Sequence, residues 1–212
     1  MSKKMKMLQI LNLWRLIPAY LIVCASNNKA IIFEEIQHWK KCTGRTEKAG
    51  FDIFSSLMLE LKEYRTLLQY RLGGYSKLLL KMLFPGMDTL YINTPEIGPR
   101  LFIQHGFATN ISAKRIGSDC WINQQVTIGY TFDSEPPVIG NGVRISAGAK
   151  VLGQIEIGDN AIIGANAAVV KSVEENMIVG GVPAKIIGEN SKHKLFIGDK
   201  QSSLYNDYEV RK

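Results

Sequence analysis

The residue best placed for proton transfer in this chain is His105. The sequence contains three histidines. His38 stands beside Trp39 in a segment with helical spacing, and His193 lies in a polar tail, so neither position indicates chemistry. His105 follows a short apolar run and stands at an expected turn. The neutral imidazole can accept a proton from a hydroxyl near neutral pH and so act as a general base. A histidine at a turn has a purely structural role about half the time, so the role of His105 depends on the elements around it.

Apolar residues recur every six positions through the second half of the chain. They are Ile97, Ile103, Ile116, Ile122, Ile128, Ile139, Ile145, Val151, Ile157, Ile163 and Val169. A fixed internal period defines a repeat architecture, and three hexads of one strand and one turn each close a coil of about eighteen residues. The apolar residues point inward, and no coil can bury them without a neighbour. The sequence therefore predicts a parallel β-helix of about four coils.

The interruption of the period that matters for function lies between Ile128 and Ile139, where five extra residues fall within Tyr130–Pro137. Insertions in repeat proteins become loops on one face, and that face is often the binding face. Tyr130, Asp133 and Glu135 would lie on this loop. We therefore expect Tyr130 to contact a substrate, although a plain surface excursion would give the same pattern.

The residues before the repeat have helical spacing. One candidate helix includes Ile31 to Trp39, a longer one runs over Phe54–Tyr70, and Gly73-Gly74 separates it from a third. The predicted organisation is an α-helical N-terminal domain over residues 1–88, a β-helix catalytic domain over 89–188, and a C-terminal tail over 189–212.

The positive charge is concentrated in the helical part. Residues 1–90 hold fourteen Lys and Arg against seven Asp and Glu, a balance of +7, whereas residues 91–212 hold twelve of each. A basic face could contact anionic lipid or a phosphate-bearing carbohydrate intermediate, or it could be an ordinary solvated surface. No motif of basic and aromatic residues typical of nucleic-acid binding is present, so we expect no nucleic-acid partner. The apolar stretch from Met7 to Ala25 is interrupted by polar residues, which disfavours a spanning helix.

Cysteine usage favours a reducing compartment. Three cysteines, Cys24, Cys42 and Cys120, cannot form a disulfide framework and do not have metal-ligand spacing. We expect a cytoplasmic protein without a bound metal, whose basic region could contact the inner face of the membrane.

Four motifs in the second half resemble the serine acetyltransferase-type hexapeptide-repeat acyltransferases. They are Gln104-His105-Gly106, the run from Trp121 to Gly129, the run from Ser146 to Gly153, and Gly181-Val182-Pro183-Ala184-Lys185. The resemblance covers about residues 90–188. It implies a left-handed β-helix, which departs from the usual right-handed crossover. It also implies acetyl-CoA as the acetyl donor, a homotrimer that could pair into a dimer of trimers, and active sites in the clefts between subunits.

The same resemblance suggests roles for individual residues. His105 matches the family's catalytic histidine, and Gln124 matches a glutamine in the next coil that would bind substrate. Ala147 and Ala165 match positions whose backbone groups bind the pantetheine arm of CoA. The remaining cofactor positions are Lys171 and Lys185, which match basic residues that reach the CoA phosphates, and Gly129, which would let the thioester approach closely.

The chain departs from the serine-using members at the inserted loop. They carry a histidine just before the proline that ends the loop, and here the matching residues are Glu135-Pro136-Pro137. A carboxylate substrate would meet a like charge there. Gln104 replaces the aspartate before the catalytic histidine, and Glu96 and Asp88 are candidates for the carboxylate that orients it. The shorter helical region and the run from Ile103 to Phe107 resemble more closely the acetyltransferases of capsule and exopolysaccharide assembly.

We therefore expect O-acetylation of a sugar hydroxyl in polysaccharide biosynthesis, with His105 as general base. Three alternatives remain: serine O-acetylation in cysteine biosynthesis, N-acylation of an amino sugar, and a non-catalytic β-helix scaffold. A β-helical carbonic anhydrase is excluded because its zinc needs three histidines from the coils, and only His105 lies there.

Overall fold

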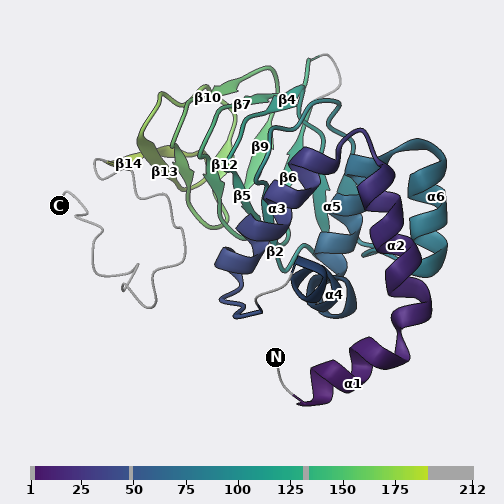
Figure 1. The fold of residues 1–212 in the computed structure, drawn as a ribbon. Helices are drawn as coiled ribbons and strands as arrows, with labels where there is room; N and C mark the ends of the chain where they lie inside the picture. Colours follow the sequence, from purple (N-terminus) through teal and green to yellow (C-terminus); the bar gives the residue numbers. More distant parts are fainter. Residues whose placement is uncertain (1–2, 48–49, 131–133, 191–212) are drawn as a thin grey trace. The chain divides into compact units, whose positions relative to one another are not determined.

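The computed structural model describes residues 3–47, 50–130 and 134–190, and the chain divides into two compact units, Met1–Asp88 and Thr89–Lys212. Asp133, His193 and nearly all of the predicted tail lie outside the described residues. Each unit is described by itself below (Figure 1).

The first unit consists of α-helices. These are α1 (Lys3–Leu11), α2 (Leu13–Ala25), α3 (Lys29–Cys42), α4 (Gly50–Glu60), α5 (Lys62–Leu72) and α6 (Gly74–Leu83). Its core contains the fully buried side chains of Leu16, Ile36, Phe54 and Leu67. One ion pair is enclosed with them: Arg71 Nη2 lies 2.6 Å from Glu35 Oε1, with side chains 5% and 2% exposed.

The long helix expected over Phe54–Tyr70 is two helices, α4 and α5. Leu61 between them has extended backbone angles, φ −114° and ψ 105°. The last carbonyl groups of α4 have therefore lost their helical partners, and Arg65 replaces them. Its Nε donates to the carbonyl of Met58 at 2.6 Å and its Nη2 to that of Leu59 at 2.9 Å.

The second unit is a parallel β-helix. Sheet A has the order β1-β3-β6-β9-β12, sheet B the order β10-β7-β4, and sheet C the order β14-β13-β11-β8-β5-β2. The strands are β1 (Leu90–Ile92), β2 (Phe102–Gln104), β3 (Thr109–Ile111), β4 (Arg115–Ile116), β5 (Trp121–Asn123), β6 (Thr127–Gly129), β7 (Val138–Ile139), β8 (Arg144–Ile145), β9 (Lys150–Leu152), β10 (Glu156–Ile157), β11 (Ile162–Ile163), β12 (Ala168–Val169), β13 (Met177–Gly180) and β14 (Lys185–Glu189). All pairs are parallel except β13 with β14, where the chain reverses direction.

The β-helix has five coils, one more than the expected four. Each coil supplies one strand or bridge to each sheet, and five parallel strands stack in sheet A. The two strands that were not expected are β1 and β13. They lie before and after the regular repeat, where the interval between inward residues is no longer six. The inward residues form the predicted ladders: Ile103 pairs with Ile122, and Ile122 with Ile145, and all three are about 1% exposed.

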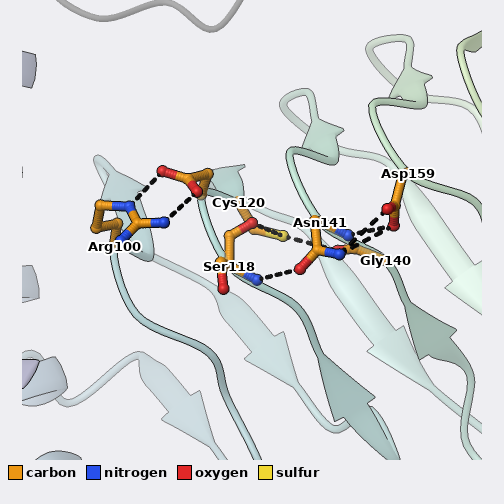
Figure 2. A network of polar contacts seen from close by, with 7 residues as sticks. Arg100, Ser118, Cys120, Gly140, Asn141 and Asp159 are labelled. Carbon is orange, nitrogen blue, oxygen red and sulfur yellow. Dashed lines mark hydrogen bonds and ion pairs between the residues drawn. The ribbon is translucent and has the colours of Figure 1, made fainter.

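A chain of polar contacts follows the corner between sheets B and C (Figure 2). Arg100 donates from Nε and Nη2 to the carboxylate of Asp119, both at 2.6 Å. In the following coils, the backbone N–H of Ser118 donates to Asn141 Oδ1 at 2.9 Å, and that of Asn141 donates to Asp159 Oδ1 at 2.7 Å. Side chains thus satisfy backbone groups that the turns leave unpaired.

Glycine follows the inward residue of sheet B because the coils stack closely at this corner. The positions are Gly98, Gly117, Gly140 and Gly158. A Cβ added to Gly117 would lie 2.7 Å from the carbonyl carbon of Gly140, closer than side chains approach backbone in proteins. Cys120 fills the core beside this ladder, and its thiol donates to the carbonyl of Gly140 at 3.1 Å.

Candidate functional site

His105 lies directly after β2, at the corner between sheets C and A in the first coil. A constant period of six from Ile103 would make Thr109 the next inward residue, but the register with Ile128 is held by Ile111. Two additional residues therefore enlarge this corner. His105 itself has φ 60°, in the left-handed region that few side chains adopt, and its backbone carbonyl accepts a hydrogen bond from the N–H of Phe107.

The side chain of His105 is exposed, and within the described residues its imidazole makes no hydrogen bond. Both ring nitrogens are accordingly available to a substrate. Left-handed backbone angles recur at other turns of the β-helix, including Gln125 and Asn166 at the same corner, so the conformation of His105 belongs to the turn geometry.

Three of the predicted ligand-binding residues continue the corner of His105 through the next coils. Gln124 follows Asn123, which pairs with Gln104, and its carbonyl accepts the N–H of Gly148 at 3.0 Å. In turn the carbonyl of Ala147 accepts the N–H of Asn166 at 2.9 Å. His105, Gln124, Ala147 and Ala165 therefore form one column, which we call the histidine corner. Three coil spacings of ~4.8 Å make it roughly 14 Å from the first to the last.

The histidine corner contains one buried polar atom without a partner. Gln124 Oε1 is inaccessible to solvent and accepts no hydrogen bond among the described residues. A buried acceptor without a donor costs free energy, about 1–3 kcal/mol, and such groups need an explanation. Within the described residues, Gln124 therefore stands out at this corner by its incomplete hydrogen bonding.

Lys185 lies at the far end of the same corner. It begins β14 and pairs with Gly180, the last residue of β13, while the N–H of Ala184 donates to the carbonyl of Ala168 at 2.8 Å. Its side chain is exposed. An extended ligand along the histidine corner would thus meet an imidazole at one end and an ammonium group at the other.

The other predicted ligand-binding residues, Gly129, Tyr130 and Lys171, lie at a different corner. Gly129 ends β6 and pairs with Leu152, so it stands where sheet A passes to sheet B. A Cβ at Gly129 would have no atom within 4 Å, which leaves room beside it. Tyr130, 63% exposed, and the exposed Lys171 share this corner, which we call the loop corner. Within one chain the whole width of sheet A separates it from His105.

A polar cluster beside His105 was not expected from the sequence. Gln104 Oε1 accepts from Trp121 Nε1 and from Asn123 Nδ2, both at 3.3 Å. The guanidinium of Arg144 lies 5.2 Å from the ring centre of Trp121. These residues precede or follow the inward position of each hexad, so their outward direction could have been inferred, but their mutual contacts depend on the register.

No described carboxylate hydrogen-bonds His105. Glu96, one of the two candidates, ion-pairs with Arg115 instead, its Oε1 lying 3.2 Å from Arg115 Nε. Asp88 is exposed and has no described contact with the imidazole. In the described parts of the chain, no group of three His, Cys, Asp or Glu side chains could hold a metal ion.

The comparisons with known proteins agree on one type of fold. A family model described as bacterial transferase hexapeptide (six repeats) matches residues 136–171. A solved structure of serine acetyltransferase from Brucella abortus superposes with a TM-score of 0.63 and 29% identity, covering 76% of this chain and 69% of that one. The chain has the left-handed, hexapeptide-repeat β-helix of the serine acetyltransferase type. The predicted fold class is thereby confirmed.

Proteins that are similar in sequence are also named serine acetyltransferase. Serine acetyltransferase of Buchnera aphidicola is 35% identical over 162 residues, which cover 69% of this chain and 59% of the relative. That of Mycobacterium tuberculosis is 43% identical over 98 residues, covering 44% of this chain and 43% of the relative. The chain thus spans about half the length of the curated relatives it matches. A further structure, serine acetyltransferase from Brucella abortus in complex with coenzyme A, matches with a TM-score of 0.59 and 28% identity, over 76% of this chain and 68% of that one.

The expected sugar O-acetylation in polysaccharide biosynthesis is wrong. The similar proteins, in sequence and in structure, are named serine acetyltransferases, and none of those described above is named for a polysaccharide. The expectation gave too much weight to a few local departures, chiefly the missing histidine in the inserted loop and Gln104 before His105. The four motifs spread over the β-helix constrain far more of the site than those positions do.

Proposed function

We propose that this chain is an acetyl-CoA-dependent serine O-acetyltransferase. The observation that carries the proposal is the exposed imidazole of His105, unpaired among the described residues, at the head of the histidine corner. The serine acetyltransferases similar to this chain, one of them solved with coenzyme A, support the donor and the acceptor. The role of each residue below is part of the proposal.

The reaction requires one proton to move away from the acceptor and one to reach the leaving group. A ring nitrogen of His105 takes the proton of the serine hydroxyl while the oxygen attacks the carbonyl carbon of the acetyl thioester. The carbon–sulfur bond then breaks, and the protonated imidazole returns the proton to the CoA thiolate. Backbone N–H groups near Gly129 would stabilise the negative charge on the carbonyl oxygen, a term commonly worth ~3–4 kcal/mol.

The histidine corner suits the long pantetheine arm of acetyl-CoA. The corner residues of its third and fourth coils, Ala147 and Ala165, have small side chains, which leave their backbone accessible. Lys185 at its end would bind a CoA phosphate as a compact point charge. Gln124, in the next coil, would bind serine beside His105 after a change of rotamer that exposes its Oε1, which is enclosed here.

We further propose that the active site is shared between copies of the chain, and the positions of the two corners support this. Gly129, Tyr130 and Lys171 lie a sheet width from His105, so no single chain surrounds one ligand with all of these residues. A homotrimer in which the loop corner of one copy faces the histidine corner of the next would do so. Light scattering of the purified protein should then give three times the 23.7 kDa mass of the chain, or a multiple of that value.

The test is release of CoA from acetyl-CoA by the purified protein, with L-serine, D-serine, L-threonine and a panel of sugars as acceptors. We expect turnover with L-serine and formation of O-acetylserine by mass spectrometry. Mixing the acceptors in pairs would show competition for one site. Turnover with sugars and none with L-serine would overturn the proposal, and so would CoA binding without turnover on any acceptor.

A further inference from the structure

The helical unit has an exposed apolar face along α1, α2 and α6. The exposed side chains recur at spacings of three and four residues, as on one side of a helix. They are Met7, Ile10 and Leu11 on α1, Trp14, Ile17 and Leu21 on α2, and Tyr75, Leu78, Leu79 and Met82 on α6, each at least 48% exposed. We call these ten residues the apolar face. Exposed apolar side chains gathered on neighbouring helices often mark an interaction site.

The apolar face is held in place by contacts within the unit. Arg15 of α2 stacks on the ring of Phe84, 4.4 Å from its centre, and its Nη1 donates to the carbonyl of Leu83 at 3.3 Å, which ties α2 to the end of α6. On the opposite side of α2, Leu16 and Val23 are fully buried. The core therefore fixes the rotation of α2, and its exposed side chains do not result from a loosely attached helix.

The charged residues on the three helices of the apolar face have one sign. The helices α1, α2 and α6 contain no Asp or Glu, and Glu34 is the first acidic residue in the chain. Exposed lysines accompany the apolar residues, and they are Lys3, Lys4, Lys6, Lys77 and Lys81. A surface complementary to this one must accept apolar side chains and carry negative charge.

We propose that the apolar face docks on an anionic lipid surface, with its apolar side chains below the headgroups and its lysines among them. Trp14 and Tyr75 have the amphipathic rings that are favoured at this depth. Each lysine close to such a surface adds attraction. A second copy of the chain fits less well, because two apolar faces in contact would oppose their lysines without any acidic partner.

The geometry favours docking on the surface over crossing it. No single helix among the described residues is long and apolar enough to span a membrane. The pair α1 and α2 reaches the required length and composition together, but it is bent by 80°. Amphipathic helices that lie in the plane of the interface present one apolar side and basic residues, as here.

The test is co-sedimentation of the full chain with vesicles of phosphatidylcholine alone or mixed with phosphatidylglycerol. We expect binding only to the mixed vesicles, and weaker binding as salt is raised. The double variant Lys77→Glu with Lys81→Glu should bind the mixed vesicles at least about tenfold more weakly than the parent. The control, Lys41→Glu with Lys114→Glu, changes the net charge equally outside the apolar face and should bind like the parent. Trp14 emission should shift to the blue on binding.

Three results would overturn this proposal. One is the absence of binding to the anionic vesicles, and another is equal loss of binding in both double variants. The third is a parent oligomer that dissociates when Lys77 and Lys81 are replaced, with no effect on vesicles, since the apolar face would then join copies of the chain. Serine acetylation by the same samples is measured separately, so failure of either proposal leaves the other intact.

Discussion

Replacement of His105 by asparagine should abolish most of the activity while leaving the fold intact. Asparagine is among the residues that most readily adopt the left-handed conformation observed at this position, φ 60°, so the backbone can stay as it is. The imidazole is exposed and makes no described side-chain hydrogen bond, so its removal breaks no stabilising contact. The variant therefore isolates the chemistry of the ring.

The expected magnitudes differ sharply between rate and stability. Loss of a general base lowers the rate by ~10²–10⁴, which corresponds to about 3–5 kcal/mol in the activation free energy. An exposed substitution of this kind changes the free energy of unfolding by about 0.5 kcal/mol or less. For a chain of this size that shifts Tm by about 1–2 °C.

The assay is steady-state CoA release with L-serine, together with CoA binding by calorimetry and thermal unfolding of the same preparation. CoA affinity should be unchanged, because Ala147 lies two coil spacings, ~10 Å, from His105. A His105→Asn variant that turns over serine within about threefold of the parent would refute the role of His105 as general base. An inactive variant that has also lost CoA binding or unfolds early would refute the reasoning that separates chemistry from structure.

Three further predictions follow from local contacts. Gly117→Ala should destabilise the β-helix by ~1–3 kcal/mol in thermal unfolding, because its Cβ would overlap the next coil, whereas Gly129→Ala should leave Tm unchanged because its Cβ enters open space. Glu35→Gln should destabilise the helical unit by ~3–5 kcal/mol in calorimetry, because it removes the negative charge from the buried ion pair with Arg71; a neutral result would mean that water reaches the pair. Burial raises the pKa of the Cys120 thiol to about 12. Unfolding exposes the thiol, which then loses its proton at its ordinary, lower pKa. Between that ordinary pKa and about pH 12, the free energy of unfolding therefore falls by ~1.4 kcal/mol per pH unit. Cys120→Ala should flatten that alkaline loss of stability, measured by denaturant unfolding at several pH values.

The β-helix could be predicted because its inward positions tolerate little but apolar residues. Ile122, Ile145 and Ile163 carry the same constraint in successive coils, so the period is visible in one sequence. The strands at the two ends, β1 and β13, were missed where the corner lengths change. Thr109 fits the period of six from Ile103 and is itself buried, so nothing in the sequence distinguishes it from Ile111. The structure shows that Ile111 continues the ladder, because it pairs with Ile128.

The candidate site was predictable in part. The column of His105, Gln124 and Ala147 follows from the period once the corner positions are recognised. The separation of Gly129 and Tyr130 onto another corner follows only from knowing which sheet each strand joins. The break at Leu61 could not be inferred either, because a single extended residue between two apolar helical runs leaves the helical spacing almost unchanged.

The antiparallel strand β14 has a consequence for solubility. A solenoid built of parallel strands ends in a row of unpaired backbone N–H and C=O groups, which can recruit the end of another solenoid and start a fibre. The turn after β13 sends the chain back so that Lys185–Glu189 occupies this row on sheet C. Reversed direction and an exposed lysine make β14 a poor template for a further parallel coil. On sheet C, this short segment therefore disfavours end-to-end pairing with another solenoid.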